Sequence, residues 1–232
     1  MRERSPDLLG KGCEKVITTV FWDWNGTLVA DVPLVVRVNN EVFRRHGLRQ
    51  TDAEEYRRLF RFPVKDYYAE MGVSETQFYQ IAQEWSQAYH AQFPGTPLTP
   101  HAMETVTRLK AAGLRQVILS ASRETLLLEQ LAQYPELAAC FDQVLGLGDI
   151  YASSKVERGV QYLAQAGLKG SEAVFLGDTL HDAETASAMG CACLLISGGH
   201  QTDEMLGRAG VPVMPSLREA GEWILEMRGH EA

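Results

Sequence analysis

The amino-acid sequence predicts an α/β fold in which a parallel sheet carries helices on both faces, with a small all-helical unit inserted after the first strand. From residue 98 onward, short β-rich runs alternate with helical stretches, a rhythm typical of parallel sheets. Between residues 30 and 97, every periodic stretch has helical spacing and no strand-like run occurs. These two observations define the expected architecture.

The elements follow in order along the chain. The first strand is predicted at residues 16–22, a β-rich apolar run. Helices with apolar residues every three or four positions follow at 33–46, 52–60, 65–71 and 75–92. Three prolines between residues 94 and 100 then break the helical periodicity. The later elements are expected as helix 102–112, strand 116–119, helix 124–132, strand 143–145, helix 155–166, strand 173–176, helix 181–189, strand 192–196 and helix 217–227.

The proline-rich break and the strand-free stretch indicate two domains. Residues 1–30 and 98–232 are predicted to form the α/β core, and residues 31–97 a helical cap. Both sizes lie within the usual range for folded domains.

Composition excludes several classes of function. The 22 lysines and arginines against 30 acidic residues give a formal net charge of −8, which argues against a nucleic-acid partner. The sequence has no apolar run long enough for a membrane span, and residues 1–15 lack the apolar region of a secretory signal. Four scattered cysteines are expected to be reduced and structural. We therefore expect a cytoplasmic protein with no membrane partner.

Polar side chains follow the predicted strands where each strand ends. In a parallel sheet the carboxyl ends of the strands meet at one edge, where ligands bind. One such residue alone is an ordinary turn or capping residue, but their occurrence at successive strand ends favours an active site. The candidates after strands are Asp23, Asn25, Ser120, Asp178 and Asp182, and Lys155, which opens the helix after the third strand, joins them.

These residues stand in the order of four known motifs. The motifs read Asp23-x-Asn25-Gly26-Thr27, then Ser120, then Lys155, then Gly177-Asp178-x-x-x-Asp182. In this order the chain resembles the haloacid dehalogenase (HAD)-like hydrolases, and it is most similar to their phosphoglycolate-phosphatase-like branch. The resemblance implies a HAD-like Rossmannoid core with a C1-type cap.

The resemblance also implies an enzyme that hydrolyses a small phosphorylated metabolite with Mg²⁺. Asp23 would be the nucleophile that forms an aspartyl-phosphate. Asp23, the backbone carbonyl of Asn25 and Asp178 would hold Mg²⁺, with Asp182 acting through water or by orienting Lys155.

Phosphate binding is implied for a second set of residues. Ser120 and the backbone around Ala121 would bind the phosphoryl oxygens, and Lys155 would neutralise the developing charge. Thr27 of the first motif belongs to the same substrate-binding set.

Asn25 departs from the phosphatase pattern, which has a second aspartate at this position as general acid and base. An amide cannot exchange a proton at neutral pH. The protein is therefore a phosphatase that acts on good leaving groups or borrows an acid, a hydrolase that cleaves another bond, or a phosphate-binding protein with little turnover. Phosphonoacetaldehyde hydrolases exemplify the second option and need a cap lysine for an imine, for which Lys65 is the candidate. A haloacid dehalogenase needs no metal and fits less well.

The cap should select the leaving group. Arg61 and Lys65, which flank Pro63 between two predicted cap helices, are expected to bind a second anionic group of the substrate. His181 and His200, which lie near strand ends, are candidates for the rim of the site, with ordinary loop histidines as the alternative.

Overall fold

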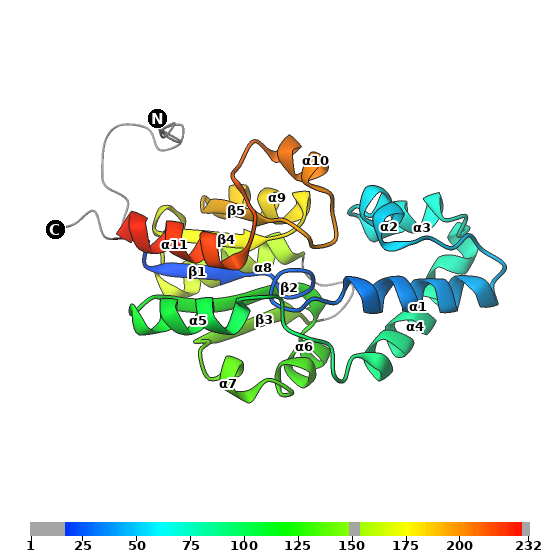
Figure 1. The fold of residues 1–232 in the computed structure, drawn as a ribbon, viewed down its shortest axis with the longest axis horizontal. Coiled ribbons are helices and arrows are strands. Elements are labelled where there is room, and N and C mark those ends of the chain that lie inside the picture. Colours follow the sequence, from blue (N-terminus) through cyan, green and yellow to red (C-terminus); the bar gives the residue numbers. More distant parts are fainter. Residues whose placement is uncertain (1–16, 149–153, 229–232) are drawn as a thin grey trace.

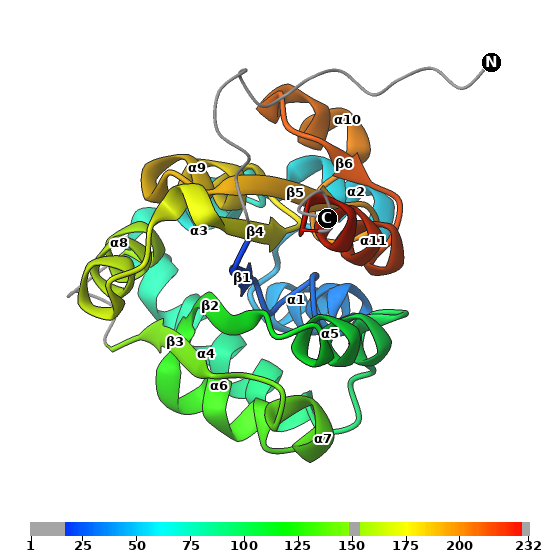
Figure 2. The same cartoon turned by 90° about the vertical axis from the view of Figure 1, so that its left-hand side faces the viewer.

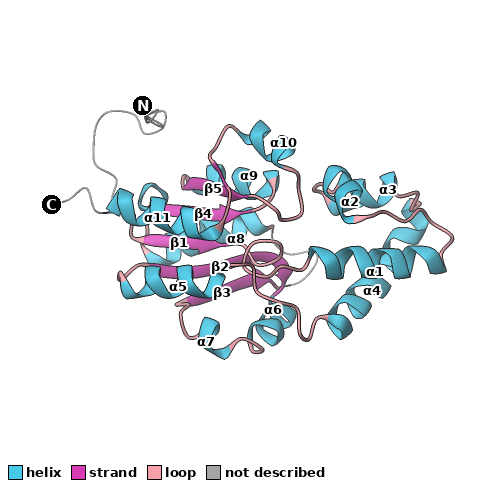
Figure 3. Ribbon diagram, viewed as in Figure 1, coloured by secondary structure: helices cyan, strands magenta, loops and turns pink. Residues whose placement is uncertain are grey.

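The computed structural model describes residues 17–148 and 154–228, which form a sheet between layers of helices with a further helical group at one end (Figure 1). Six parallel strands make one sheet in the order β3-β2-β1-β4-β5-β6, which confirms the predicted α/β class (Figure 3). The strands are β1 Thr19–Trp22, β2 Arg115–Arg123, β3 Gln143–Leu147, β4 Ala173–Gly177, β5 Ala192–Ile196 and β6 Val213–Met214. The helices are α1 Val32–Arg45, α2 Ala53–Leu59, α3 Val64–Glu70, α4 Glu75–Gln92, α5 Ala102–Ala111, α6 Glu124–Leu131, α7 Pro135–Ala138, α8 Lys155–Ala166, α9 Leu180–Met189, α10 Asp203–Leu206 and α11 Leu217–Arg228, with 3-10 turns at Gly170–Glu172 and Gly207–Ala209.

Strand β1 divides the apolar interior into two layers. Val20 and Trp22 belong to the cluster that includes residues of α5 and α11, whereas Phe21 packs in the cluster with residues of α8 and α9. Figure 2 shows these two helix pairs on opposite faces of the sheet. All four residues of β1 are buried, which explains why this strand has a continuous apolar run instead of alternating polarity.

The carboxyl ends of the central strands lie side by side. Phe21 of β1 is in register with Val117 of β2 and with Phe175 of β4. The loops that follow these strands therefore open at the same edge of the sheet, which is the edge that faces α1–α4 in Figure 1.

Helices α1–α4 are held to the core by two crossing chain segments. The Ala30 amide donates to the Pro97 carbonyl at 2.9 Å, and Val29 bridges Leu98 in antiparallel fashion. The chain enters and leaves the helical group at this crossing, at the limits that the sequence predicts for the cap. We keep residues 31–97 as a proposed cap domain and use that name below.

Several details differ from the sequence-based expectation. Strand β2 continues to Arg123 instead of ending at residue 119, because a register shift lets it pair again with Leu147 of β3. Strand β6 and helices α7 and α10 were not predicted, since two to four residues are too few to show a period. The start of the first predicted strand at Val16 lies outside the described residues.

The described part of the chain bears on the expected state of the cysteines and on the expected lack of a membrane span. Cys140, Cys191 and Cys193 are free thiols, and Cys13 lies outside the described residues. None of the helices in residues 17–148 and 154–228 combines the length and the apolar character needed to cross a membrane.

A buried glutamine within β2 leads to a prediction about the core. Gln116 is fully buried, accepts a hydrogen bond from Trp22 Nε1 at 3.2 Å and donates to the Val106 carbonyl at 2.9 Å. We expect Gln116→Leu to lower the free energy of unfolding by about 1–3 kcal/mol, because both buried partners lose their hydrogen bond. Urea denaturation measures the change. Gln133→Leu on the exposed surface is the matched control, and an equal effect of both variants would contradict this assignment.

Candidate active site

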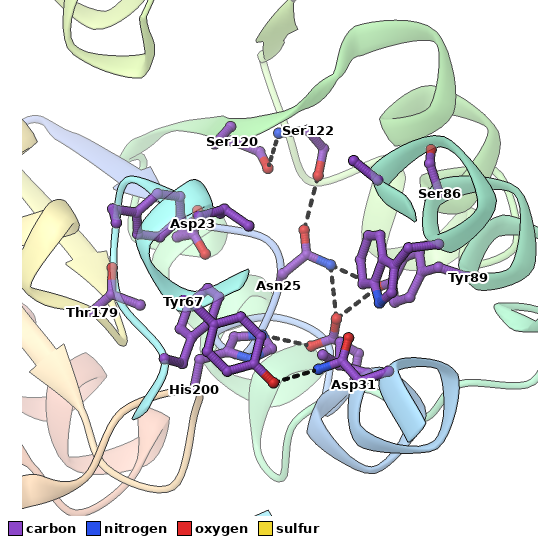
Figure 4. Close-up of a pocket in the computed structure, with 18 of the residues that line it drawn as sticks. Asp23, Asn25, Asp31, Tyr67, Ser86, Tyr89, Ser120, Ser122, Thr179 and His200 are labelled. Carbon is purple, nitrogen blue, oxygen red and sulfur yellow. Dashed lines mark hydrogen bonds and ion pairs between the residues drawn. The ribbon is translucent and has the colours of Figure 1, made fainter. Parts of the chain in front are cut away.

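A cavity of about 370 Å³ lies where the carboxyl edge of the sheet meets the proposed cap (Figure 4). The core contributes Asp23, Asn25, Ser120 and Lys155 to its wall, together with residues of the loop after β4. The strand-end residues selected from the sequence are therefore brought together at one site, as the parallel sheet requires.

The turn after β1 presents Asp23 to this cavity. The Asp23 amide donates to the Leu176 carbonyl at 2.8 Å, so this residue still continues the pairing of β1 with β4. Gly26 then reverses the chain with φ of +75°, and a Cβ at this position would lie 2.3 Å from Asp178 Oδ2. Only glycine allows both the left-handed backbone and the close approach of the two loops.

Three buried carboxylates lie close together, and two of them pair with one buried lysine. One carboxylate oxygen from each of Asp23, Asp178 and Asp182 lies within 4.8 Å of the others. Lys155, the first residue of α8, donates from Nζ to Asp23 Oδ1 and to Asp182 Oδ1, the second at 2.5 Å. Since Lys155 is only 3 % exposed, these ion pairs have little access to solvent screening.

Asp182 divides its two oxygens between the lysine and the loop that begins α9. Its Oδ2 accepts from the Thr179 amide at 2.9 Å, from Thr179 Oγ1 at 2.7 Å and from the Asp178 amide at 3.1 Å. This capping arrangement fixes the Asp182 carboxylate, which in turn fixes the Lys155 ammonium beside Asp23.

The negative charge of the three carboxylates is only partly compensated by Lys155. Burial raises the pKa of Asp23 to about 8, with Lys155 opposing and the carboxylates of Asp182 and Asp178 adding to the rise. Burial also raises the pKa of Asp178 to about 6. For Asp182, burial would raise the pKa, but Lys155 outweighs it and lowers the pKa. The pKa of Lys155 is raised because the two carboxylates outweigh its burial.

The donor set fits a hard divalent cation. The three carboxylates outnumber the single ammonium, and the oxygen atoms lie close enough to share one ion. Mg²⁺ prefers such oxygen ligands. Each oxygen of Asp178 accepts one hydrogen bond, from Thr27 Oγ1 at 2.9 Å and from the His200 amide at 2.6 Å, and can still bind a cation.

Asn25 is held in a fixed orientation (Figure 4). Its Nδ2 donates to Asp31 Oδ2 at 2.8 Å and to the Tyr89 hydroxyl at 2.7 Å, and its Oδ1 accepts from Ser122 Oγ at 2.9 Å. These three contacts distinguish the amide nitrogen from the amide oxygen. A carboxylate at position 25 could not donate to Asp31, so the amide at this position suits its surroundings.

Asp31 anchors the network around Asn25. It is fully buried at the start of α1, accepts from the Gly26 amide at 2.8 Å and from the Tyr89 hydroxyl at 2.6 Å, and lies 3.2 Å from His200 Nε2. Burial would lower the pKa of His200, but the negative charge of Asp31 outweighs it and raises this pKa to about 9. Burial would raise the pKa of Asp31, but His200 and the hydrogen bonds lower it.

The sequence does not single out Asp31, Tyr89 or Ser122, although all three contact Asn25. Tyr89 lies 64 residues and Ser122 lies 97 residues from Asn25. No local pattern connects residues so far apart. The position of Asp31 a few residues after the first motif is the one available signal. His200, a candidate for the rim, lines the cavity, whereas His181 stacks on Phe62.

The predicted phosphate-binding residues have different positions. Ser120 and Ala121 line the cavity, and Ser120 Oγ accepts from the Ser122 amide at 3.1 Å. Thr27 is fully buried and donates to Asp178, and it does not line the cavity. Its contact with substrate stays a prediction, while its observed contact orients Asp178.

Arg61 and Lys65 do not line the cavity. Arg61 pairs with Glu70 at 2.9 Å, and Lys65 pairs with Glu75 at 2.9 Å, both at the exposed surface of the proposed cap. The sequence-based role for them, binding a second anion, has no support from this arrangement. The physical reason is the presence of acidic neighbours nine and ten residues further along the chain, which hold the two cations outward.

The fold and this acidic site define a class of hydrolase. Residues 17–190 match the haloacid dehalogenase-like hydrolase family, and the chain belongs to that family. It is 24% identical over 208 residues to a phosphoglycolate phosphatase of Synechococcus elongatus, with 89% of this chain and 92% of the relative covered. A phosphoglycolate phosphatase of Salmonella typhi is 27% identical over 206 residues, covering 84% of this chain and 71% of the relative.

Solved structures share the fold. A haloacid dehalogenase-like family protein from Streptococcus pneumoniae superposes with a TM-score of 0.79 at 22% identity, covering 89% of this chain and 98% of the other. CbbY from Rhodobacter sphaeroides, solved in complex with phosphate, has a TM-score of 0.71 at 22% identity and covers 89% of this chain and 99% of its own.

The anchoring role of Asp31 leads to a prediction. We expect Asp31→Ala to lower the free energy of unfolding by about 3–5 kcal/mol, because the buried His200 would lose its counter-charge. The buried groups that donate to Asp31 would also lose their acceptor. Urea denaturation at neutral pH measures the loss. The exposed Asp66 of α3 provides the control, since Asp66→Ala should change stability by no more than about 0.5 kcal/mol. Equal stabilities of the two variants would contradict the role of Asp31.

Proposed function

We propose that the protein is a Mg²⁺-dependent phosphatase that hydrolyses a small phosphorylated metabolite through an aspartyl-phosphate. The observation that carries the proposal is Asp23, which ends β1 inside the cavity with Lys155 and two further carboxylates against it. The family and the phosphoglycolate phosphatases that the chain resembles support the same reaction class.

Asp23 attacks phosphorus, so that a bond forms from its carboxylate oxygen as the ester bond to the leaving oxygen breaks. Asp23, the Asn25 carbonyl and Asp178 would hold Mg²⁺, which neutralises negative charge between the nucleophile and the phosphate. Asp182 positions Lys155, and Lys155 stabilises the charge that develops on the phosphoryl oxygens. Ser120 and the backbone at Ala121 bind the remaining oxygens.

The phosphonoacetaldehyde alternative depends on Lys65. This lysine is 53% exposed, pairs with Glu75 and lies outside the cavity wall, so an imine with bound substrate has no geometric support. The phosphate-binding alternative stays open as an outcome of the experiments below, because Asn25 lacks a transferable proton.

Removal of the nucleophile tests the proposal. We expect the protein with Mg²⁺ to hydrolyse phenyl phosphate and Asp23→Asn to lower the rate by roughly 10⁴-fold or more, since the amide cannot form the phosphoenzyme. Release of phosphate is the measurement. Asp66→Asn on the exposed surface is the control, and a native protein no more active than Asp23→Asn would favour the binding protein instead.

Metal binding has a readout separate from turnover. We expect Mg²⁺ at a hundredfold excess over its Kd to stabilise the protein by about 2.7 kcal/mol, which corresponds to a rise in Tm of roughly 5–10 °C. Differential scanning fluorimetry measures the shift. Asp178→Asn should abolish most of it, whereas Asp66→Asn should preserve it. A shift that survives in Asp178→Asn would place the ion elsewhere.

A further inference from the structure

We propose that the substrate is the phosphate monoester of a phenol, with its aromatic ring seated against the proposed cap. The inference rests on the phosphatase function above and specifies its substrate class. Two independent features lead to it, namely an aromatic cap wall without lysine or arginine among the described residues and the absence of a proton donor at position 25.

The cap wall of the cavity consists mainly of ring faces. Ala82, Trp85, Ser86 and Tyr89 recur at helical spacing, so one face of α4 points into the cavity. Trp85 and Tyr89 stack with ring centroids 4.9 Å apart and an angle of 13° between the planes. The other cap aromatic residues in the wall are Tyr56, Phe60, Phe62, Tyr67 and Tyr68.

Two of the phenol hydroxyls of this wall already have hydrogen-bond partners. The Tyr67 hydroxyl accepts from Asn39 Nδ2 at 3.0 Å, and the Tyr56 hydroxyl lies 2.9 Å from His200 Nδ1. Burial raises the pKa of Tyr67 to about 12, so its phenol is neutral. The Trp85 Nε1 atom is buried and has no hydrogen-bond partner among the described residues. The ring faces themselves are apolar and suit an aromatic ring by stacking or edge contacts.

No lysine or arginine of the proposed cap lines the cavity among the described residues. The cations in the wall come from the core, namely Lys155, Arg123 and His200. Lys155 balances Asp23 and Asp182, His200 balances Asp31, and Arg123 lies exposed at the end of β2. A carboxylate of the leaving group placed against the aromatic rings, away from Arg123, would therefore be buried without a counter-charge.

The chemistry at Asn25 favours the same ester. When Asp23 bonds to phosphorus, the electron pair of the breaking bond goes to the leaving oxygen. An alkoxide needs a proton at that moment, whereas a phenolate, whose conjugate acid has a pKa of about 10, leaves without one and takes its proton from water. The hydroxyls that contact Asn25 are Tyr89, which donates to Asp31, and Ser122, which donates to Asn25 itself. Water then hydrolyses the aspartyl-phosphate to phosphate and Asp23.

A series of four esters tests the proposal on the native protein with Mg²⁺. Phenyl phosphate and benzyl phosphate both carry an aromatic ring, but only phenyl phosphate has a phenolate as its leaving group. The leaving groups of benzyl phosphate, ethyl phosphate and phosphoglycolate are all alkoxides. Of these three, only the benzyl group has a ring and only that of phosphoglycolate carries a charged carboxylate. We expect kcat/KM to fall at least about tenfold from phenyl to benzyl phosphate, and again at least about tenfold from benzyl phosphate to ethyl phosphate and to phosphoglycolate.

The failures of the two proposals are distinguishable. Hydrolysis of phosphoglycolate or ethyl phosphate as fast as benzyl phosphate would overturn the aromatic cap site, and equal rates for benzyl and phenyl phosphate would overturn the phenol ester. With either outcome the protein would still be a phosphatase. Hydrolysis of none of the four above the Asp23→Asn background would overturn the phosphatase itself.

A pair of variants on α4 locates the ring. We expect Trp85→Leu to lower the ratio of kcat/KM for phenyl over ethyl phosphate by about tenfold, because the stacking surface is lost. Tyr79→Leu is the matched control, since Tyr79 is on the same helix, 69% exposed and outside the cavity wall. An unchanged ratio in Trp85→Leu would overturn the placement. Should that variant fold poorly, the four-ester series on the native protein decides alone.

Discussion

The site depends on the burial of Lys155 between two carboxylates. Without its ammonium, Asp23, Asp178 and Asp182 would repel one another at the edge of the sheet, and desolvation would protonate them. The lysine is held where it is because Asp182 is itself fixed by three hydrogen bonds from the loop before α9. The fold thus orients Asp23, the proposed nucleophile, through a chain of polar contacts that begins at the end of β4.

A second set of contacts joins the proposed cap to this centre. Asp31 at the start of α1 bonds the Asn25 amide and pairs with His200, which follows β5. From α2, Arg57 donates to the carbonyls of Gly198 and Gly199 at 3.1 and 2.8 Å. The proposed cap therefore contacts the core on two sides of the cavity, and its aromatic residues line the same cavity as Asp23. Position 25 and the proposed cap are in direct contact, because Asn25 Nδ2 donates to the Tyr89 hydroxyl of α4 (Figure 4).

The residues that follow strands could be predicted from the sequence, because a parallel sheet brings its carboxyl ends together wherever those strands lie in the chain. Asp23, Ser120, Lys155 and Asp182 were found in this way. The surroundings of Asn25 could not be predicted, since Tyr89 and Ser122 reach it from distant segments without any periodic signal. Arg61 and Lys65 were expected to point inward because cations suit an anionic substrate, but the direction of a long side chain depends on neighbours such as Glu70 and Glu75. The positions of the side chains of the proposed cap thus became known only from the structure, whereas the motif residues could be selected from the sequence.

The central claim is that Asp23 carries the phosphoryl group between the two halves of the reaction. Mixing the protein with phenyl phosphate and Mg²⁺, quenching in acid within milliseconds and mapping the peptides by mass spectrometry tests it directly. The account predicts one phosphoryl group per chain on Asp23, formed as phenol is released and missing in Asp23→Asn. Release of phenol without a modified Asp23, or with the phosphoryl group on another residue, would contradict it.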